Sequence, residues 1–195
     1  QPSMIKNLET KYKLVDNLTP YEEKGIFLES TSSMVFDRVN MIAYIGKSVR
    51  TNENLAREWC SKNGFEIVIF ETTSHRNNPI YHTDVLMFVG TDMIGLCDEV
   101  INDDYKEEVL SRAQKYHDVM LLTKDQILDF CGNALEARNN KDEKYLIMSS
   151  RAQKSLTSSQ IVKIKKYYKD IIHADISTIE KYGGGSARCM LTELF

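Results

Sequence analysis

The sequence predicts an α/β fold built from repeated strand–strand–helix–strand units. Apolar runs with strand character and one amphipathic helix pattern recur three times, in the same order, between residues 33 and 172. Each round spans roughly 50 residues, a period typical of architectures in which every repeat is one supersecondary unit. Such repeats favour short sheets arranged radially around an axis, so that each unit contacts mainly its neighbours.

The first round supplies a hairpin, a helix and a buried strand. Polar residues 37–40 separate the two hairpin strands, and Gly64 provides a stop signal at the end of the helix. The helix pattern places its apolar residues on one face. The predicted elements of this round are strands over 34–36, 42–45 and 67–70 and a helix over 52–63.

The next two rounds repeat this order. Two Thr-x-x-Gln sequences, Thr123–Gln126 and Thr157–Gln160, are capping boxes that predict helix starts. A final strand over 187–195 begins a further round, and the polar residues 1–25 are expected to be a linker-like part of one domain, 1–195. The other predicted elements are strands over 80–89, 93–97, 119–122, 134–138, 145–148 and 171–172, and helices over 104–116, over 123–130 and after residue 157.

Composition narrows the classes of function. The 195 residues include 25 basic and 28 acidic side chains, so the formal charge is −3 and no basic face for nucleic acid is indicated. Four widely spaced cysteines indicate neither a zinc site nor a disulfide framework. No apolar run reaches the ~18 residues of a membrane helix. We therefore expect a cytoplasmic protein that acts on a small molecule without metal or organic cofactor. Because the chain begins with glutamine, we expect a removed leader or a missing N-terminal part.

Cys189 is the first candidate nucleophile. It follows three glycines, Gly183–Gly185, which allow a tight turn and a close approach of other groups. A cysteine reacts as its thiolate, and the amides of such a turn can stabilise that anion, whereas Arg188 is expected on the opposite face of the predicted strand. The alternative is a buried cysteine that serves as a small apolar residue, the role expected for Cys60 and Cys97.

Three more candidates precede Cys189 at intervals of about 50 residues, namely Glu29, His82 and Asn133. The imidazole of His82 can act as a general acid or base near neutral pH. As alternate residues of one predicted strand, His82 and Asp84 face the same side, where the carboxylate can bind a cationic substrate group. A solvated strand edge is the structural alternative for these polar residues.

Arg50 directly precedes the helix predicted over 52–63. Its forked guanidinium suits bidentate binding of a carboxylate, and the amides at the start of the helix can act on the same anion. A surface ion pair is the structural alternative for Arg50.

Five ordered motifs resemble those of the pentein superfamily of guanidino-group-modifying enzymes. The nearest resemblance is to the amidinotransferase-like family that includes the citrulline-utilisation hydrolases. Arginine deiminases and dimethylarginine dimethylaminohydrolases are more distantly similar. The resemblance covers residues 21–195 and is carried by Leu28–Asp37, Arg50–Asn52, Tyr81–Asp84, Phe130–Asn133 and Gly183–Met190.

This resemblance implies a role for each candidate. Cys189 matches the family nucleophile, His82 the general acid/base, and Glu29 the acid that orients the imidazole. Arg50 matches an arginine that holds the substrate α-carboxylate in the related dimethylarginine hydrolases, and Asn133 matches a position that lines the site. The superfamily fold is an α/β propeller of five modules. The chain would hold the C-terminal three-fifths of that ring, to be completed by a missing N-terminal segment or by a homo-oligomer.

Two departures from the family pattern bear on the substrate. Ser30 and Ser32 stand where the family has glycines, which changes the backbone freedom after the acid. Asp84 stands where the nearer family has asparagine, as in the His-x-Asp sequence of arginine deiminases. A carboxylate favours a cationic guanidinium over a neutral ureido group.

The leading hypothesis is a cysteine-dependent hydrolase that acts on the guanidino or ureido C–N bond of arginine- or citrulline-like amino acids through a covalent intermediate. The alternatives are an amidinotransferase, which passes the group to a second amine, and a non-catalytic binding module. We predict that Glu29, His82 and Cys189 converge on one pocket, with the imidazole between the carboxylate and the thiol.

Overall fold

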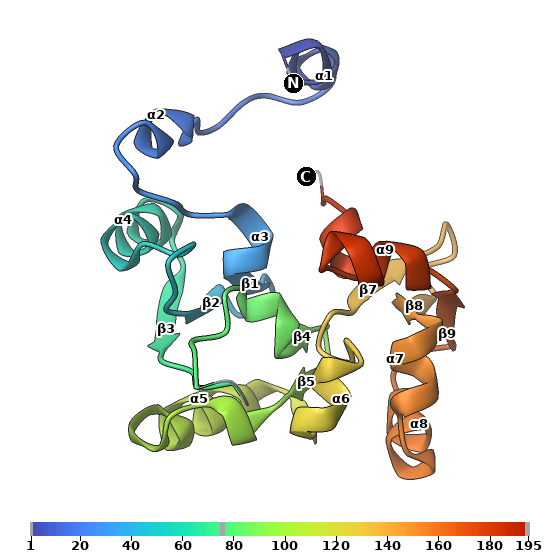
Figure 1. Ribbon diagram of the computed structural model, residues 1–195. Helices are drawn as coiled ribbons and strands as arrows, with labels where there is room; N and C mark the ends of the chain where they lie inside the picture. The colour runs from blue at the N-terminus through green and yellow to red at the C-terminus, as the bar shows by residue number, and fades with distance from the viewer. Residues whose placement is uncertain (1, 75–76, 194–195) are drawn as a thin grey trace.

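The computed structural model describes residues 2–74 and 77–193, which form three consecutive three-stranded sheets flanked by helices (Figure 1). Each sheet begins with an antiparallel hairpin, and its third strand returns parallel to the second. In the first sheet Met34 lies opposite Ile45, and Ala43 lies opposite Ile67. The other two sheets have the same pattern. The predicted repeat of strand–strand–helix–strand units is therefore confirmed.

The strands are β1 Met34–Asp37, β2 Ile42–Gly46, β3 Glu66–Phe70, β4 Met87–Val89, β5 Met93–Leu96, β6 Asp118–Leu121, β7 Leu135–Arg138, β8 Lys144–Ser149 and β9 Asp170–Ala174. The helices are α1 Pro2–Glu9, α2 Thr19–Glu22, α3 Ser30–Ser33, α4 Glu53–Asn63, α5 Asp103–Tyr116, α6 Lys124–Leu128, α7 Ser150–Ser155, α8 Ser158–Ile164 and α9 Ser177–Gly183. Short 3₁₀ turns cover Thr83–Val85, Asp98–Val100 and Arg188–Met190.

Local capping chemistry determines where several helices begin and end. The side chain of Asn52 accepts a hydrogen bond from the amide of Leu55 at 3.0 Å and so caps α4. Gly64 ends the same helix with a left-handed backbone, φ 76°, which glycine adopts without steric cost. Both predicted capping boxes are present, at the starts of α6 and α8.

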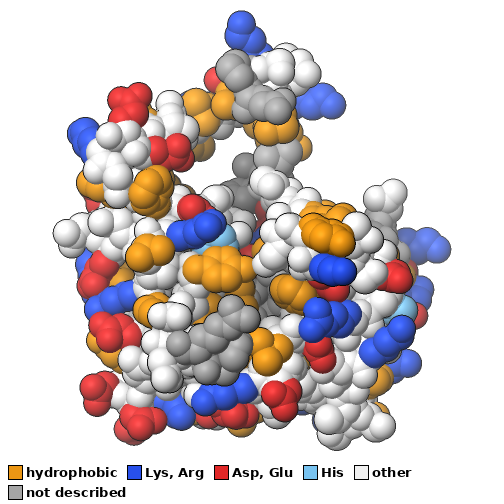
Figure 2. Space-filling view, viewed as in Figure 1, with side chains coloured by type: hydrophobic (Ala, Val, Ile, Leu, Met, Phe, Trp, Pro, Cys, Tyr) orange, Lys and Arg blue, Asp and Glu red, His pale blue; other side chains and the backbone are white. Residues whose placement is uncertain are grey.

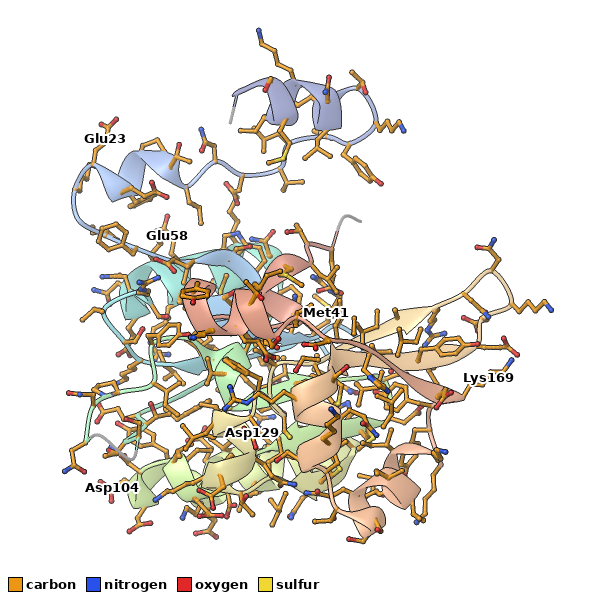
Figure 3. All side chains as sticks on the ribbon, turned by 45° about the vertical axis from the view of Figure 1, so that its right-hand side comes forward. Glu23, Met41, Glu58, Asp104, Asp129 and Lys169 are labelled. Atoms are coloured by element: carbon orange, nitrogen blue, oxygen red, sulfur yellow. The ribbon has the colours of Figure 1, made fainter. Side chains whose placement is uncertain are left out.

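One apolar core runs through all three units, and its largest buried side chains include Tyr44, Phe70 and Phe88. A smaller cluster fills the space between the first sheet and α4. The first strands of the units contact one another, β1 with β4 and β4 with β7. Charged side chains such as Glu58, Asp104 and Lys169 point outward (Figure 3). None of the described helices is long and apolar enough to span a membrane.

A helix of each following unit covers the third strand of the unit before it. In α8, Gln160 and Lys163 donate to the carbonyl oxygens of Leu121 and Val119, at 2.9 and 2.7 Å, along β6. In α5, Arg112 forms an ion pair with Glu66 of β3 at 2.8 Å. The third strand of the last unit, β9, is largely exposed.

Two predicted strands are wrong in part. The strand expected over 80–89 is confined to β4, because Thr83 bonds to the first unit and bends the preceding backbone into a 3₁₀ turn. His82 and Asp84 are therefore not alternate residues of a strand. The final strand expected over 187–195 is a 3₁₀ turn at Arg188–Met190 without strand pairing up to residue 193, and residues 194–195 lie outside the described part.

The N-terminal segment contains the short helices α1 and α2, which the weak sequence pattern did not predict. It leads away from the sheets, and the space-filling view shows an opening beneath it (Figure 2). Several of its apolar side chains are exposed, including Leu14 and Val15.

Candidate active site

Glu29 brings the first part of the site together. Its Oε2 accepts a hydrogen bond from Nε2 of His82 at 2.6 Å and lies 3.3 Å from Nη1 of Arg50. Glu29 is the central residue of a tight turn, with φ −85° and ψ 59°, in which the amide of Ser30 donates to the carbonyl of Leu28 at 2.9 Å. The turn places the carboxylate at the start of α3, the short helix that leads into β1.

Two buried hydroxyl groups fix this turn against its neighbours. Ser33 Oγ accepts from the amide of Glu29 at 3.1 Å and donates to the carbonyl of Arg50 at 3.1 Å. Thr83 Oγ1 donates to the carbonyl of Ser33 at 2.6 Å and accepts from the amide of Gly46 at 2.8 Å. The backbones that carry Glu29, Arg50 and the residue after His82 are thereby joined.

Asn133 and Asp84 form the second part of the site, around Cys189. The side chain of Asn133 donates to Sγ of Cys189 at 3.2 Å and to the carbonyl of Asp84 at 3.2 Å, and it accepts from the amide of Cys189 at 3.3 Å. The thiol lies 3.7 Å from Oδ2 of Asp84. Asn133 and Asp84 are each 1% exposed, whereas Cys189 is exposed.

Two glycines permit these close contacts. A Cβ on Gly132 would lie 2.3 Å from the carbonyl oxygen of Val85, so only glycine allows the segment of Asn133 to pack against the segment of Asp84. A Cβ on Gly185 would lie 3.1 Å from Sγ of Cys189, and a side chain there would crowd the thiol. Of the three glycines that precede Cys189 in the sequence, Gly185 thus lies against its side chain.

The electrostatics around Cys189 oppose the free thiolate and favour a cation. Although the residue is exposed, partial desolvation of its thiol by the surrounding groups, followed by the charge of Asp84, raises the pKa of Cys189 above its ordinary value. Burial also raises the pKa of Asp84, while His82 and Arg188 act in the opposite direction. Oδ1 of Asp84 is buried and has no hydrogen-bond partner among the described residues. A cationic group lying beside both the thiol and the carboxylate would stabilise both anions.

The structure groups the six predicted site residues into two sets. Glu29, His82 and Arg50 form one set, and Cys189, Asn133 and Asp84 form the other. Within the described part of the chain, no hydrogen bond joins His82 to Cys189. The imidazole position between carboxylate and thiol therefore stays a prediction, although the contact of His82 with Glu29 satisfies one half of it.

Two residues near the site were given no role from the sequence. Arg188 lies in a 3₁₀ turn and not on the predicted strand; it is buried and pairs with Glu193 at 3.5 Å. Tyr81 contacts both Arg50 and the His82 ring. Its position inside the Tyr81–Asp84 motif was the feature of the sequence that could have indicated its role.

Among the described residues, no group of three or more His, Cys, Asp or Glu side chains is placed to hold a metal ion.

Comparison with solved structures shows the same fold in arginine-modifying enzymes. ArgZ, an arginine dihydrolase from cyanobacteria, superposes with a TM-score of 0.67 at 15% identity, over 86% of this chain and 25% of that chain. The N-terminal domain of ArgZ bound to product gives a TM-score of 0.66 at 16% identity, over 84% of this chain and 55% of that chain.

The amidinotransferase SxtG from Microseira wollei gives a TM-score of 0.53 at 17% identity, over 81% of this chain and 45% of that chain. The chain thus spans between a quarter and about half of the length of these structures. No curated protein sequence matches the chain.

A family comparison matches residues 2–195 to the family described as N,N dimethylarginine dimethylhydrolase, eukaryotic. This match and the structural neighbours confirm the resemblance to the pentein superfamily. The dimethylarginine hydrolases, which the motifs placed among the more distant relatives, are the family whose description fits the whole described chain. With its thiol, imidazole and carboxylates on the matched segments, the chain belongs to the eukaryotic N,N dimethylarginine dimethylhydrolase family of hydrolases acting on C–N bonds.

Proposed function

We propose that the chain carries the catalytic site of a hydrolase that cleaves a guanidino C–N bond of arginine or a methylated arginine. The observation that carries this proposal is the thiol of Cys189 lying 3.7 Å from the buried carboxylate of Asp84. This arrangement allows the carboxylate to bind a guanidinium next to the sulfur that attacks it. Family membership, and a neighbour whose N-terminal domain is covalently bonded to a reaction intermediate, support the same chemistry.

The first step is attack by sulfur on the guanidino carbon. The guanidinium binds beside Asp84, whose orphaned Oδ1 can accept one of its N–H donors. The positive charge favours ionisation of Cys189, because two unit charges about 4 Å apart attract by about 4 kcal/mol at the effective dielectric of a protein site. Asn133 donates to the sulfur and stabilises the thiolate. The S–C bond forms as the C–N π electrons move to nitrogen.

His82 transfers the protons of both steps. Because Nε2 is bonded to Glu29, Nδ1 is the nitrogen that can serve the substrate. His82 takes the proton that the Cys189 thiol releases on attack. The resulting imidazolium protonates the departing amine, the C–N bond breaks and a covalent thiouronium remains on Cys189. The neutral imidazole then removes a proton from water, which adds to the same carbon, and the C–S bond breaks to release a ureido product.

Arg50 is the proposed anchor for the α-carboxylate of the substrate. Its guanidinium is half exposed and, among residues 2–74 and 77–193, keeps one long ion-pair contact, 3.3 Å to Glu29, so it retains donors for an incoming carboxylate. The ion pair with Glu29 is the alternative role that the sequence left open. Both roles are compatible, because a guanidinium has five N–H donors.

Amidino transfer is the second candidate function, favoured by the structural likeness to an amidinotransferase. In that reaction the sulfur keeps the amidino group after the alkyl amine departs, and a second amine takes the place of water. The two reactions share the attack by sulfur, but they differ in the amine that departs and in the acceptor that releases the group from sulfur.

Turnover by the natural full-length protein tests the proposal. Arginine, monomethyl- and dimethylarginines, citrulline and agmatine are supplied separately, and ammonia, methylamines, citrulline and ornithine are measured, with and without glycine as an amine acceptor. We expect release of ammonia or a methylamine together with citrulline. Cys189→Ser should abolish turnover, because a hydroxyl is far less ionised than a thiol near neutral pH.

Cys60→Ala is the matched control. Cys60 is buried in the small cluster beside α4, away from the site, and should retain turnover when its substitution leaves the fold intact. Full activity of Cys189→Ser would overturn the mechanism. Release of ornithine only when glycine is present, with the amidino group transferred to glycine, would favour the transferase, and binding of arginine without turnover would favour the binding module.

A further inference from the structure

Tyr81 contacts three parts of the candidate site that come from distant segments of the chain. Its ring lies 4.8 Å from the His82 ring, measured between centroids. The guanidinium carbon of Arg50 lies 5.6 Å from the centroid of the Tyr81 ring. Its hydroxyl donates to the carbonyl of Gly184 at 2.9 Å, across 103 residues of sequence. One side chain thus connects the proposed carboxylate anchor, the proposed acid/base and the turn before the nucleophile.

The contact with Gly184 bears directly on the position of Cys189. Gly184 ends α9 with a left-handed backbone, φ 72°, and the next residue, Gly185, is packed against the Cys189 side chain. The Tyr81 hydroxyl therefore holds the peptide group that joins the two glycines. Burial, followed by the charges of Cys189 and Asp84, raises the pKa of Tyr81, so this hydroxyl remains a donor at neutral pH.

The other contacts of Tyr81 fix the position of Arg50. The side chain of Ser48 donates to the carbonyl of Tyr81 at 2.7 Å and accepts from the amide of Arg50 at 3.1 Å. The Tyr81 ring faces the guanidinium, an arrangement that orients an arginine as well as attracting it. Backbone and ring together join Arg50 to the residue that holds the Cys189 turn.

We propose that Tyr81 is a positioning residue that sets the distance between the Cys189 sulfur and the Arg50 guanidinium, and so selects substrates whose carboxylate and guanidino groups are separated by an arginine-length chain. This inference rests on the proposed function, in which sulfur and Arg50 act on opposite ends of one substrate. Tyr81 takes no part in bond making. Its ring and its hydroxyl have separable effects, one on the anchor and one on the nucleophile.

Two substitutions separate these effects. Tyr81→Phe keeps the ring but removes the hydrogen bond to Gly184, so kcat should fall roughly threefold to tenfold, the range for loss of one hydrogen bond, with KM for arginine unchanged. Tyr81→Leu also removes the ring from Arg50. It should raise KM for arginine severalfold but leave KM for agmatine, which has no carboxylate, unchanged. Homoarginine, longer by one methylene, should then be discriminated less from arginine.

Two measurements without turnover distinguish failure of this inference from failure of the proposed function. In Tyr81→Phe, backbone amides of residues 183–187 should exchange hydrogen faster than in the wild type. In the Cys189→Ala background, Tyr81→Leu should weaken binding of arginine but not of agmatine. Tyr182→Phe, at a 77% exposed tyrosine in α9, is the control and should change neither quantity.

Unchanged amide exchange and unchanged kcat in Tyr81→Phe would overturn the role of the hydroxyl. Equal weakening of arginine and agmatine by Tyr81→Leu would overturn the selection of chain length. If no substrate turns over while the exchange and binding results are as expected, the proposed reaction fails and the positioning role of Tyr81 stands.

Discussion

Without a bound cation, the carboxylate of Asp84 disfavours ionisation of the Cys189 thiol. An anion 3.7 Å from the sulfur disfavours the thiolate, and partial desolvation of the thiol acts in the same direction. The same two groups become complementary once a guanidinium lies beside both of them. A resting thiol and a cation-dependent nucleophile therefore follow from one arrangement, which would limit reaction of Cys189 with unsuitable molecules.

Asp84→Asn tests this opposition. Because Asp84 raises the pKa of the Cys189 thiol, removing its charge should lower that pKa and increase the thiolate fraction at neutral pH. Each unit of pKa change alters that fraction about tenfold, so alkylation by iodoacetamide at pH 7 should accelerate by roughly threefold to tenfold. The other cysteines are buried, so the alkylation rate reports on Cys189. The KM for arginine should rise in the same variant.

The control for this prediction is Asp129→Asn, which removes an exposed carboxylate paired with Arg151. It should leave both the alkylation profile and the KM unchanged. A slower alkylation of Asp84→Asn at every pH, in a folded protein, would contradict the assigned electrostatics.

The site residues could be predicted, but not all of their orientations. Glu29, His82, Asn133 and Cys189 lie in motifs whose residue types and order indicate the chemistry. The strand predicted around Arg188 was wrong, because the backbone forms a 3₁₀ turn there and alternation along a strand does not describe its side chains. Burial of such a side chain depends on tertiary contacts that periodicity does not report.

At the scale of single elements, the turn and short helix that carry Glu29 are strained. Ser30 has φ 51°, a left-handed conformation that costs a residue with a side chain about 1–2 kcal/mol. This is one of two positions where the resembling family has glycine. Ser32, the other, lies within α3 and has no positive φ. The two serines therefore have different consequences for stability.

Ser30→Gly should raise the free energy of unfolding by about 0.5–1 kcal/mol, because relief of strain exceeds the entropy that glycine adds to the unfolded chain. Ser32→Gly should lower it by about 0.5 kcal/mol, the difference in helix propensity. Urea denaturation of both variants measures the contrast. Equal effects of the same sign would show that the backbone around Ser30 relaxes and that the strain is not present in solution.

Elements were predictable where local sequence determines them. In the capping boxes that begin at Thr123 and Thr157, the side chains accept hydrogen bonds from backbone amides of the same short segment. Both predicted helix starts were therefore correct. The segment 80–86 has strand-like composition, but Thr83 forms hydrogen bonds with Gly46 and Ser33, which lie 37 and 50 positions before it in the chain. Those distant partners override the local preference for a strand, and a prediction from neighbouring residues alone does not take them into account.

At the scale of the whole molecule, the site is assembled from one repeated position. Glu29 precedes β1, Asp84 precedes β4 and Asn133 precedes β7, so each unit delivers a polar side chain just before its first strand. The first strands contact one another, which brings these positions together. Cys189, from the segment after the third unit, completes the group. Repetition of the unit thus explains the regular spacing of the site residues.

The same repetition leaves the third strand of the last unit uncovered. β3 and β6 each receive side chains from a helix of the next unit, whereas no described helix of a following unit lies on β9. Ile172 in β9 is 49% exposed. We expect this edge to be covered in a complete ring by a further unit, in agreement with the proposal that the chain forms three-fifths of a five-module propeller. An uncovered edge is prone to pairing with another chain.

Residues 1–195 in isolation should therefore self-associate through β9 as the protein is concentrated through the micromolar range. Ile172→Lys should suppress this association, because a charged side chain on an edge strand opposes pairing, and it should leave the melting temperature nearly unchanged since the residue is half exposed. Val162→Lys, at a 63% exposed valine of α8, controls for added charge and should associate like the wild type. Sedimentation equilibrium measures both variants. A monomer at every concentration, with β9 amides protected from hydrogen exchange, would show that these residues close the ring by themselves and that the number of modules has been underestimated.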